Sequence, residues 1–287
     1  MGVLRTIGLI FLGLFILFTI FIIAAILMSR SGTPGTTQPP NPVEVNYAAA
    51  GIQYKGPPTT AIAGYYCVYT AQVASDGWVT NCTVPTNQWW AATCNYEPSQ
   101  NAYEPPGYSI QLNAALSNGL WIQDVWGSAW SSTGSILVKE EVWNNQNLLS
   151  KVAGPPGDSC GWLVIKIQNG NAYFGYSSDG VHVNWYASYP VGNATILPTY
   201  STGLSTGIVL AGPANGAGVD FSNVYTVLAL YYWNGTGWAP APTTAGETGT
   251  QEFVTHAWVY VSGNEAVVSW PNQATTTVSV PQPGFKP

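Results

Sequence analysis

The sequence has few charged residues for its length. They make up 7% of the 287 positions, where an ordinary soluble domain has roughly 25%. With 7 Lys and Arg against 13 Asp and Glu, the chain cannot neutralise a row of phosphates, so a nucleic-acid partner is excluded. The loop Gly212 to Gly218 lacks the Lys-Ser/Thr of a phosphate-binding loop, which excludes a nucleotide. A hydrophobic fraction of 46% with 13 Trp and 17 Tyr predicts a chain that folds.

Patterns of metal ligands are also lacking. His182 and His256 each stand alone in a β-rich run, and the four cysteines lack the paired spacing of a zinc site. We therefore predict no metal and no cofactor. The even number of cysteines predicts two disulfides of open pairing in an extracellular compartment, formed by Cys67, Cys82, Cys94 and Cys160. Three N-x-Ser/Thr glycosylation signals agree with that compartment: Asn81, Asn193 and Asn234.

The N-terminus contains a long run without charge. Ile7 to Met28 comprises 22 uncharged residues between Arg5 and Arg30, which as a helix spans a hydrocarbon core of about 30 Å. We favour an uncleaved signal anchor over residues 1–30, with a cleaved signal peptide as the alternative. The protein is then anchored at the cell surface, or secreted if the segment is removed. Residues 31–42 are a Pro/Gly/Thr-rich linker, and residues 43–287 form one ectodomain.

The ectodomain has the pattern of a β protein. Beyond residue 42, no segment keeps a 3.6-residue apolar period for three turns. Turn dipeptides recur between runs of Val, Ile, Tyr and Trp, namely Asp76-Gly77, Asn118-Gly119, Asn169-Gly170, Asp179-Gly180 and Asn234-Gly235. The sequence therefore predicts an all-β, antiparallel sandwich or jelly-roll-like fold.

One predicted hairpin carries a polar patch. If Asn118-Gly119 is a two-residue turn, Asn113 faces Asp124 and Gln111 faces Trp126 on the same side of the sheet. This side is either a solvated outer face or a substrate groove, and Trp126 favours the groove. A slip of one residue would exchange the two faces.

Several segments resemble the thermopsin family of acid peptidases from thermoacidophilic archaea. The matching blocks are Tyr108 to Ala114 (YSIQLNA) with Trp121 to Val125 (WIQDV), then Glu140 to Asn144 (EEVWN), Ile208 to Gly218 (IVLAGPANGAG) and Leu230 to Gly235 (LYYWNG). The resemblance covers about residues 107–252. It implies an acid endopeptidase that cleaves extracellular polypeptides at low pH and high temperature. Glu140 and Glu141 stand where the family has Asp and Asn, and a further family carboxylate is loosely matched in Gly246 to Glu252, at Glu247.

Metal-free hydrolysis in acid needs one group that activates water and one that protonates the leaving amine. Two carboxyls that share a proton can do both, and a Gln beside a carboxyl can hold the oxyanion. The catalytic candidates are Glu140, Asp124, Gln111, Glu247 and Glu141. Glu140 ranks above Glu141 because it shares a face with Val138 and Val142 and is expected to be buried, whereas Glu141 is expected to form a solvated ion pair with Lys139. The substrate-binding candidates are Asn113, Gln123, Trp126, Gly212, Asn215 and Gly216.

Two other functions compete with the peptidase. The first is a non-catalytic surface sandwich that binds glycans or envelope proteins, with Trp89-Trp90 and Trp126 as stacking platforms. The second is a jelly-roll glycoside hydrolase. A carboxyl in contact with another carboxyl, or with Gln111 or Gln123, favours the acid peptidase. Serine catalysis at Ser159 is disfavoured because both histidines follow it in the chain.

Overall fold

The computed structural model describes most of residues 43–287. The described residues are 42–83, 89–91, 93–98, 100, 102, 106–127, 137–145, 147–199, 205–214, 216–247, 252–276 and 278–287. Contacts divide the chain into two units, Met1–Gln38 and Pro39–Pro287, and all of the described residues belong to the second. The predicted anchor at residues 1–30 lies outside the described residues, as does the linker up to residue 41. None of the helical structure within the described ranges is long and apolar enough to cross a membrane.

The described chain is built almost entirely of β-strands, which confirms the all-β prediction. The one short helix of the described ranges is the 3-10 turn η1 (Trp89–Ala91). The strands are β1 (Val43–Tyr54), β2 (Ala61–Thr83), β3 (Thr93–Glu97), β4 (Ser109–Leu116), β5 (Leu120–Gly127), β6 (Leu137–Asn144), β7 (Asn147–Pro156), β8 (Cys160–Gln168), β9 (Asn171–Ser177), β10 (Asn184–Pro190), β11 (Ile196–Leu197), β12 (Gly207–Ala211), β13 (Ala217–Trp233), β14 (Trp238–Pro240), β15 (Thr243–Glu247), β16 (Val254–Ser262) and β17 (Glu265–Trp270).

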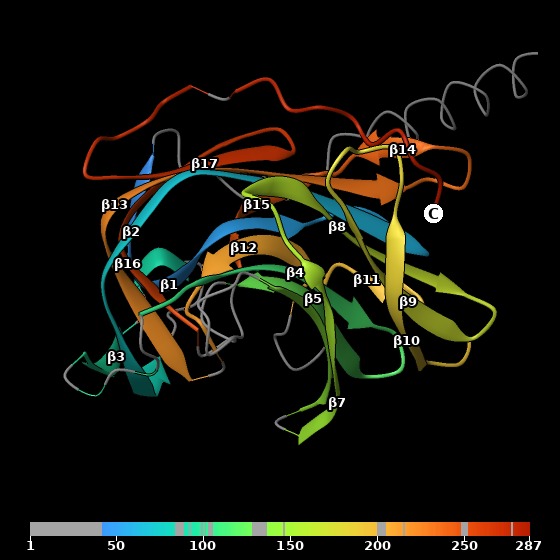
Figure 1. The fold of residues 1–287 in the computed structure, drawn as a ribbon, viewed down its shortest axis with the longest axis horizontal. Helices are drawn as coiled ribbons and strands as arrows, with labels where there is room; N and C mark the ends of the chain where they lie inside the picture. The colour runs from blue at the N-terminus through green and yellow to red at the C-terminus, as the bar shows by residue number, and fades with distance from the viewer. Residues whose placement is uncertain are drawn as a thin grey trace, which may run out of the picture. The chain divides into compact units, whose positions relative to one another are not determined.

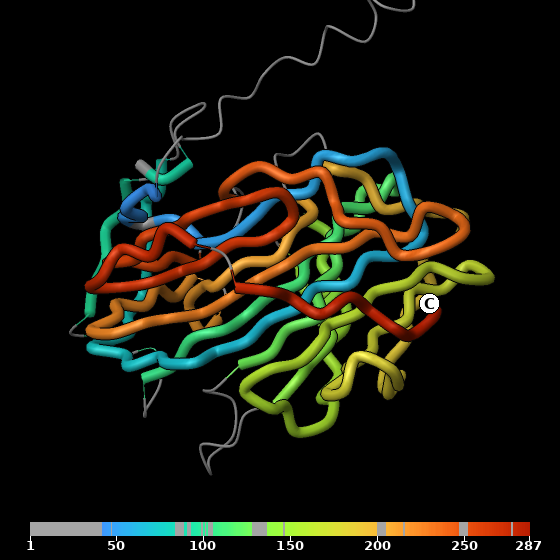
Figure 2. Tube along the Cα trace, turned by 90° about the horizontal axis from the view of Figure 1, so that it is seen from above, coloured from blue at the N-terminus to red at the C-terminus, as the bar shows by residue number. Residues whose placement is uncertain are grey.

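The strands form two groups that share β1 (Figure 1). The β13 sheet comprises β2, β3, β8, β9, β10, β13, β14, β16 and β17. The β4 sheet comprises β4, β5, β6, β7, β11, β12 and β15. The first part of β1 pairs with β16 and its second part with β12 and β15. Figure 2 shows β2 and β13 side by side along most of their lengths.

The two sheets pack together through large apolar side chains. Tyr66 of β2 meets Trp126 of β5 with ring centroids 5.1 Å apart, and both are fully buried. Gly64 allows the layers to approach, because a Cβ there would lie 2.7 Å from the side chain of Ile208 on β12. The alternation along β4 directs Ile110 and Leu112 into this core. The other face of the β4 sheet therefore points away from the β13 sheet.

Two disulfides link strands of the β13 sheet. Cys67 of β2 is bonded to Cys160 of β8, and Cys82 of β2 to Cys94 of β3. The prediction of two disulfides is confirmed, and the structure supplies the pairing that the sequence left open. Each bond ties neighbouring strands together.

Four of the five predicted turn dipeptides lie between strands, and Asp76-Gly77 does not. That pair lies within β2, where Asp76 is fully buried. The Asp76 carboxylate accepts hydrogen bonds from the backbone amides of Ala102 (3.0 Å) and Gly107 (3.1 Å). A Cβ at Gly77 would lie 2.4 Å from the carbonyl oxygen of Glu97. Asp76 thus acts as a buried hydrogen-bond acceptor, and Gly77 allows another segment of backbone to approach closely. The prediction of a turn at these two residues was wrong.

The β4–β5 hairpin differs from the predicted register by one residue. Asn113 pairs with Gln123, and Leu112 pairs with Asp124. The predicted two-residue turn needs a positive φ at both central residues, but of Asn118 and Gly119 only Gly119 (φ 91°) has one. The loop instead contains three residues and ends on this glycine, an arrangement that shifts the pairing by one. Asp124 and Trp126 consequently point into the core, while Gln111 and Asn113 point away from it.

Candidate active site

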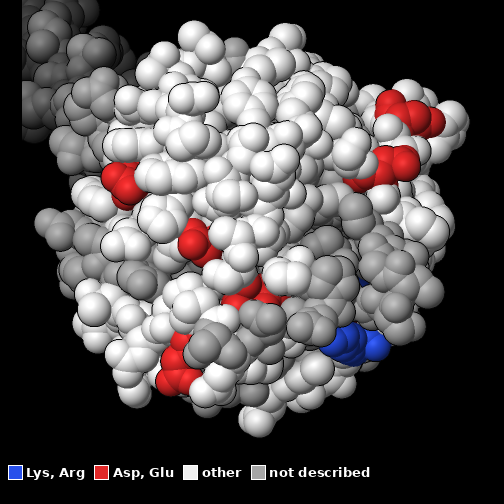
Figure 3. Space-filling model, turned by 60° about the vertical axis from the view of Figure 1, so that its left-hand side comes forward, with Lys and Arg blue, Asp and Glu red and all other residues white. Residues whose placement is uncertain are grey.

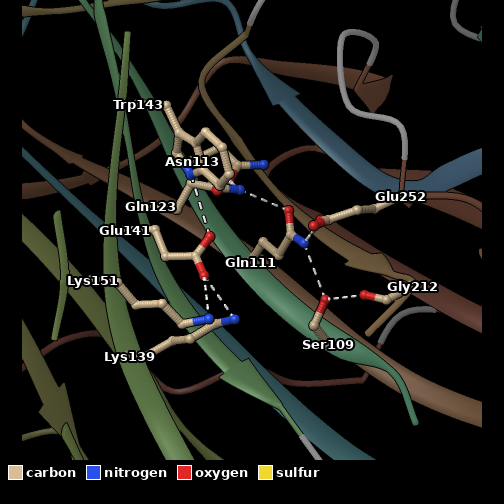
Figure 4. Close-up of polar contacts among 10 residues, drawn as sticks. All are labelled: Ser109, Gln111, Asn113, Gln123, Lys139, Glu141, Trp143, Lys151, Gly212 and Glu252. Atoms are coloured by element: carbon tan, nitrogen blue, oxygen red, sulfur yellow. Dashed lines mark hydrogen bonds and ion pairs between the residues drawn. The ribbon is translucent and has the colours of Figure 1, made fainter. Parts of the chain in front are cut away.

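Polar residues of four adjacent strands meet on the face of the β4 sheet that points away from the β13 sheet. The register places Asn113, Gln123, Glu141 and Lys151 in one row across β4, β5, β6 and β7. We call the group the amide–carboxylate cluster, and its members are Ser109, Gln111, Asn113, Gln123, Lys139, Glu141, Trp143, Lys151 and Glu252 (Figure 4). Most of these side chains are buried, so their polar atoms depend on one another for hydrogen bonds.

A chain of hydrogen bonds fixes the orientation of the amides. The Ser109 hydroxyl donates to the carbonyl of Gly212 (2.6 Å), which can only accept. Ser109 Oγ is then available as an acceptor for Gln111 Nε2 (3.1 Å), and this turns Gln111 Oε1 toward Gln123. Gln123 Nε2 donates to Gln111 Oε1 (3.0 Å) and to Asn113 Oδ1 (2.9 Å). A single backbone carbonyl thus determines the direction of the whole chain.

The second N–H of Gln111 points at a carboxyl group. It donates to Oε2 of Glu252, which lies directly before Phe253 and β16 and is 5% exposed. Burial raises the pKa of Glu252 to about 8, and the neighbouring charge of Glu141 adds to the rise, while Lys139 and Lys151 oppose it. Glu252 therefore retains its proton in acidic solution, and Gln111 holds that acid in place.

A second carboxylate of the cluster is ion-paired. Glu141 Oε1 lies 2.8 Å from Lys139 Nζ and 3.7 Å from Lys151 Nζ, and Glu141 Oε2 accepts a hydrogen bond from the indole N–H of Trp143 (3.2 Å). The predicted pair with Lys139 is confirmed. Its predicted solvation was wrong, because Glu141 and Lys139 are both 6% exposed. Burial lowers the pKa of Lys139, which the charge of Glu141 opposes.

Two more acidic residues lie on the core side of the same strands. Asp124 and Glu140 are cross-strand partners and are fully buried. Asp124 accepts hydrogen bonds from the Tyr186 hydroxyl (2.7 Å) and the Val164 amide (3.1 Å). Glu140 Oε2 accepts one from Ser150 (3.3 Å), while its Oε1 has no hydrogen-bond partner among the described residues. Burial raises the pKa of both carboxyls.

The structure separates residues that the sequence placed together. Asp124 was expected beside Gln111, but the two lie on opposite faces of the sheet because of the shifted register. Glu140 is buried as predicted, and it lies on the face opposite to Gln111 and Glu252. Trp126 was expected in a substrate groove, yet it is fully buried against Tyr66 and Tyr108.

The glycine-rich loop contributes one backbone group to the cluster. Gly212 supplies the carbonyl that orients Ser109, and a Cβ at this position would lie 1.8 Å from the carbonyl oxygen of Ala217. Gly216 lies apart from the cluster and accepts a hydrogen bond from the amide of Val79 (2.7 Å). Asn215 lies outside the described residues. Glu247 pairs through its backbone with Ala49, and its side chain lies outside the description.

Glu252 is the residue that sequence reasoning missed. The segment Gly246 to Glu252 contains two glutamates, and the resemblance selected Glu247. The signal for Glu252 was its position immediately before Phe253 and Val254, an apolar start to a strand. Only the structure shows that the residue before this strand segment, Glu252, lies at Gln111.

Other predicted positions differ in their surroundings. Asn81, Asn193 and Asn234 are exposed, as the attachment of a glycan requires. Trp89 is buried and Trp90 half-buried, and their rings meet edge to face. Trp126 is also buried, so of these three rings only Trp90 is partly exposed to solvent. No group of three His, Cys, Asp or Glu side chains in the described part of the chain is arranged to hold a metal.

The cluster combines a neutral acid, a carboxylate and oriented amide donors. Two carboxyl groups in different surroundings are the arrangement that general acid–base catalysis requires. The surface drawn in Figure 3 shows only scattered acidic and basic side chains, in keeping with the composition. No protein-family model matches this sequence, and no curated protein matches it.

Proposed function

We propose that the protein is a thermopsin-like acid endopeptidase and that the amide–carboxylate cluster is its active site. The observation that carries the proposal is the hydrogen bond from Gln111 to the buried, protonated carboxyl of Glu252. A carboxyl in contact with Gln111 favours an acid peptidase over the two alternative functions. The substrate is an extended polypeptide, and the β-sandwich ectodomain acts outside the cell behind its N-terminal anchor.

The roles follow from the charges in the cluster. Glu252 gives its proton to the nitrogen of the scissile peptide as the C–N bond breaks. The Glu141 carboxylate accepts a proton from the attacking water, whose oxygen forms the new bond to the carbonyl carbon. The N–H of Gln111 that donates to Glu252 turns to the oxygen of the tetrahedral intermediate. A proton passed from Glu141 to Glu252 restores the starting state.

The first experiment tests the reaction class. The full-length protein is incubated at high temperature with a reduced, carboxymethylated polypeptide between pH 1 and 7, and cleavage is followed by mass spectrometry. The resemblance to the thermopsin family predicts hydrolysis at about pH 2–3. Gln111→Met keeps the volume of the side chain and removes the donor to Glu252, so kcat should fall at least about 100-fold.

A matched control separates loss of chemistry from loss of fold. Gln273→Met makes the same change at an exposed position after β17 and should leave kcat unchanged. Circular dichroism verifies that each variant is folded. Folded parent protein that cleaves nothing between pH 1 and 5 would refute the peptidase, and full activity in Gln111→Met would refute the assigned site.

A further inference from the structure

The strand that follows Glu252 begins with an unusual contact. The first two residues of β16 pair with β13 in parallel, Val254 opposite Val219 and Thr255 opposite Asp220. The backbone amide of Val219 also donates to the carbonyl of Phe253 (2.8 Å). Among the described strands, all other pairings are antiparallel. The path of the chain after Glu252 is thus set by a short contact with β13.

A strained residue lies next to this contact. His256 has a φ of +55°, a left-handed conformation that glycine normally occupies. The pairing of β1 with β16 is irregular here, passing from Ala257 opposite Val45 to Thr255 opposite Asn46. His256 is therefore the extra residue of a β-bulge, and bulges of this kind redirect the strand. A histidine persists in such a conformation only where its surroundings hold it.

The ring of His256 packs against Trp270, with centroids 4.9 Å apart, and one carboxylate binds its Nδ1 atom. Asp220 Oδ1 lies 2.5 Å from His256 Nδ1 and accepts a hydrogen bond from the Thr255 hydroxyl (2.9 Å). A single side chain of β13 therefore binds two consecutive residues of β16, three and four positions after Glu252. Asp220 and His256 take no part in the cluster itself, and the mechanism proposed above does not use them.

We propose that Asp220 and His256 are positioning residues that lock the bulge at the start of β16 and so hold Glu252 against Gln111. The inference rests on the proposed function for its effect on turnover. Its structural part, the position of Glu252, stands apart from any activity. Without the clamp, the bulge relaxes toward a regular strand, and a relaxation by one residue would turn the preceding side chains to the other face.

The test follows the Glu252 carboxyl directly in the full-length protein. The side-chain carboxyl carbons of glutamate are labelled with 13C and observed by NMR. The chain has only eight glutamates, so their signals can be resolved. The signal of Glu252 is the one that disappears in Glu252→Gln. In the parent that signal should titrate with a pKa of about 8. In Asp220→Ala we expect its pKa to fall by at least about 1 unit and turnover to fall at least about 10-fold.

Two further variants serve as a rescue and as a control. Asp220→Asn keeps an oxygen that accepts from both Thr255 and His256, so it should restore the parent behaviour. Asp179→Ala removes the same type of pair, since Asp179 Oδ2 lies 2.7 Å from His182 Nδ1 on an exposed loop, and should change neither readout. If Asp220→Ala does not fold, His256→Ala keeps a side chain that disfavours the positive φ, lacks the imidazole, and should shift the Glu252 signal in the same direction.

The outcomes distinguish the two proposals. A Glu252 signal that moves in Asp220→Ala while no variant cleaves polypeptide supports the clamp and refutes the peptidase. A protein that cleaves polypeptide, with the Glu252 titration and turnover unchanged in folded Asp220→Ala or His256→Ala, refutes the clamp and leaves the peptidase standing. An equal effect of Asp179→Ala would also refute the clamp, because it would show a general response to lost charge.

Discussion

Asp124 illustrates how one residue can join the two sheets. It extends from β5 of the β4 sheet and accepts hydrogen bonds from Val164 on β8 and Tyr186 on β10, both in the β13 sheet. Its side chain is fully buried, so these donors have no alternative acceptor in water. The sequence predicted Asp124 as a catalytic candidate. Because the register of the β4–β5 hairpin differs by one residue from the predicted register, Asp124 instead points into the core and links the two sheets.

The residue-scale prediction concerns this link. Asp124→Ala leaves the Tyr186 hydroxyl and the Val164 amide without an acceptor, and the free energy of unfolding should fall by about 2–4 kcal/mol. Asp124→Asn retains one of the two acceptor oxygens, so it should reduce the free energy of unfolding by about half as much, about 1–2 kcal/mol. Urea unfolding at pH 4 measures both. Equal losses in the two variants would contradict the assigned role.

Two hairpins show why element register was only partly predictable. Both contain an Asn-Gly dipeptide, and at Asn169-Gly170 both residues have positive φ (51° and 76°), so Gln168 pairs with Asn171 across a two-residue turn. At Asn118-Gly119 only the glycine does, and the loop has three residues. The same dipeptide therefore predicts a hairpin at both places. The dipeptide cannot predict whether the loop has two or three residues, because that depends on whether the asparagine adopts a positive φ, as Asn169 does and Asn118 does not.

The site was predictable up to the point where it depends on contacts between distant strands. Alternation along β6 correctly predicted that Glu140 is buried and that Glu141 pairs with Lys139, because both are properties of one strand. The grouping of Gln111, Asn113 and Gln123 required the true hairpin register. The addition of Glu252 depends on where β16 begins, 141 positions along the chain from Gln111, and no local pattern encodes that.

At the scale of the whole molecule, the small number of basic side chains limits electrostatic repulsion within the protein at low pH. Beyond residue 30 the chain has five Lys and two His, so with all carboxyls protonated it bears only seven positive side chains. An ordinary domain of this size would have about 30 and would repel itself. Three of the carboxyls that the structure describes, Asp124, Glu140 and Glu252, have raised pKa values because they are buried.

The raised pKa values of these three carboxyls predict that they stabilise the folded protein less as the pH rises. In the unfolded chain these groups lose their protons near pH 4, whereas in the folded protein they retain them to higher pH, up to about 8 for Glu252. Their contribution to stability is complete below about pH 4 and is lost as the pH rises through each folded-state pKa, which for Glu252 is about 8, by up to about 1.4 kcal/mol per pH unit for each group. Urea unfolding from pH 3 to 9 should show this decline, and Glu252→Gln should flatten it. A stability that rises with pH over this range would contradict the protonated carboxyls.

The most direct test of the account compares two buried glutamates. Glu252 and Glu140 both have raised pKa values, but only Glu252 contacts Gln111, while Glu140 lies on the core face. The rate of polypeptide cleavage by the full-length protein at pH 3 should fall at least about 100-fold in Glu252→Gln and change less than about threefold in folded Glu140→Gln. A Glu252→Gln protein that cleaves at the parent rate, or a loss of cleavage in folded Glu140→Gln alone, would contradict the assignment of the amide–carboxylate cluster as the active site.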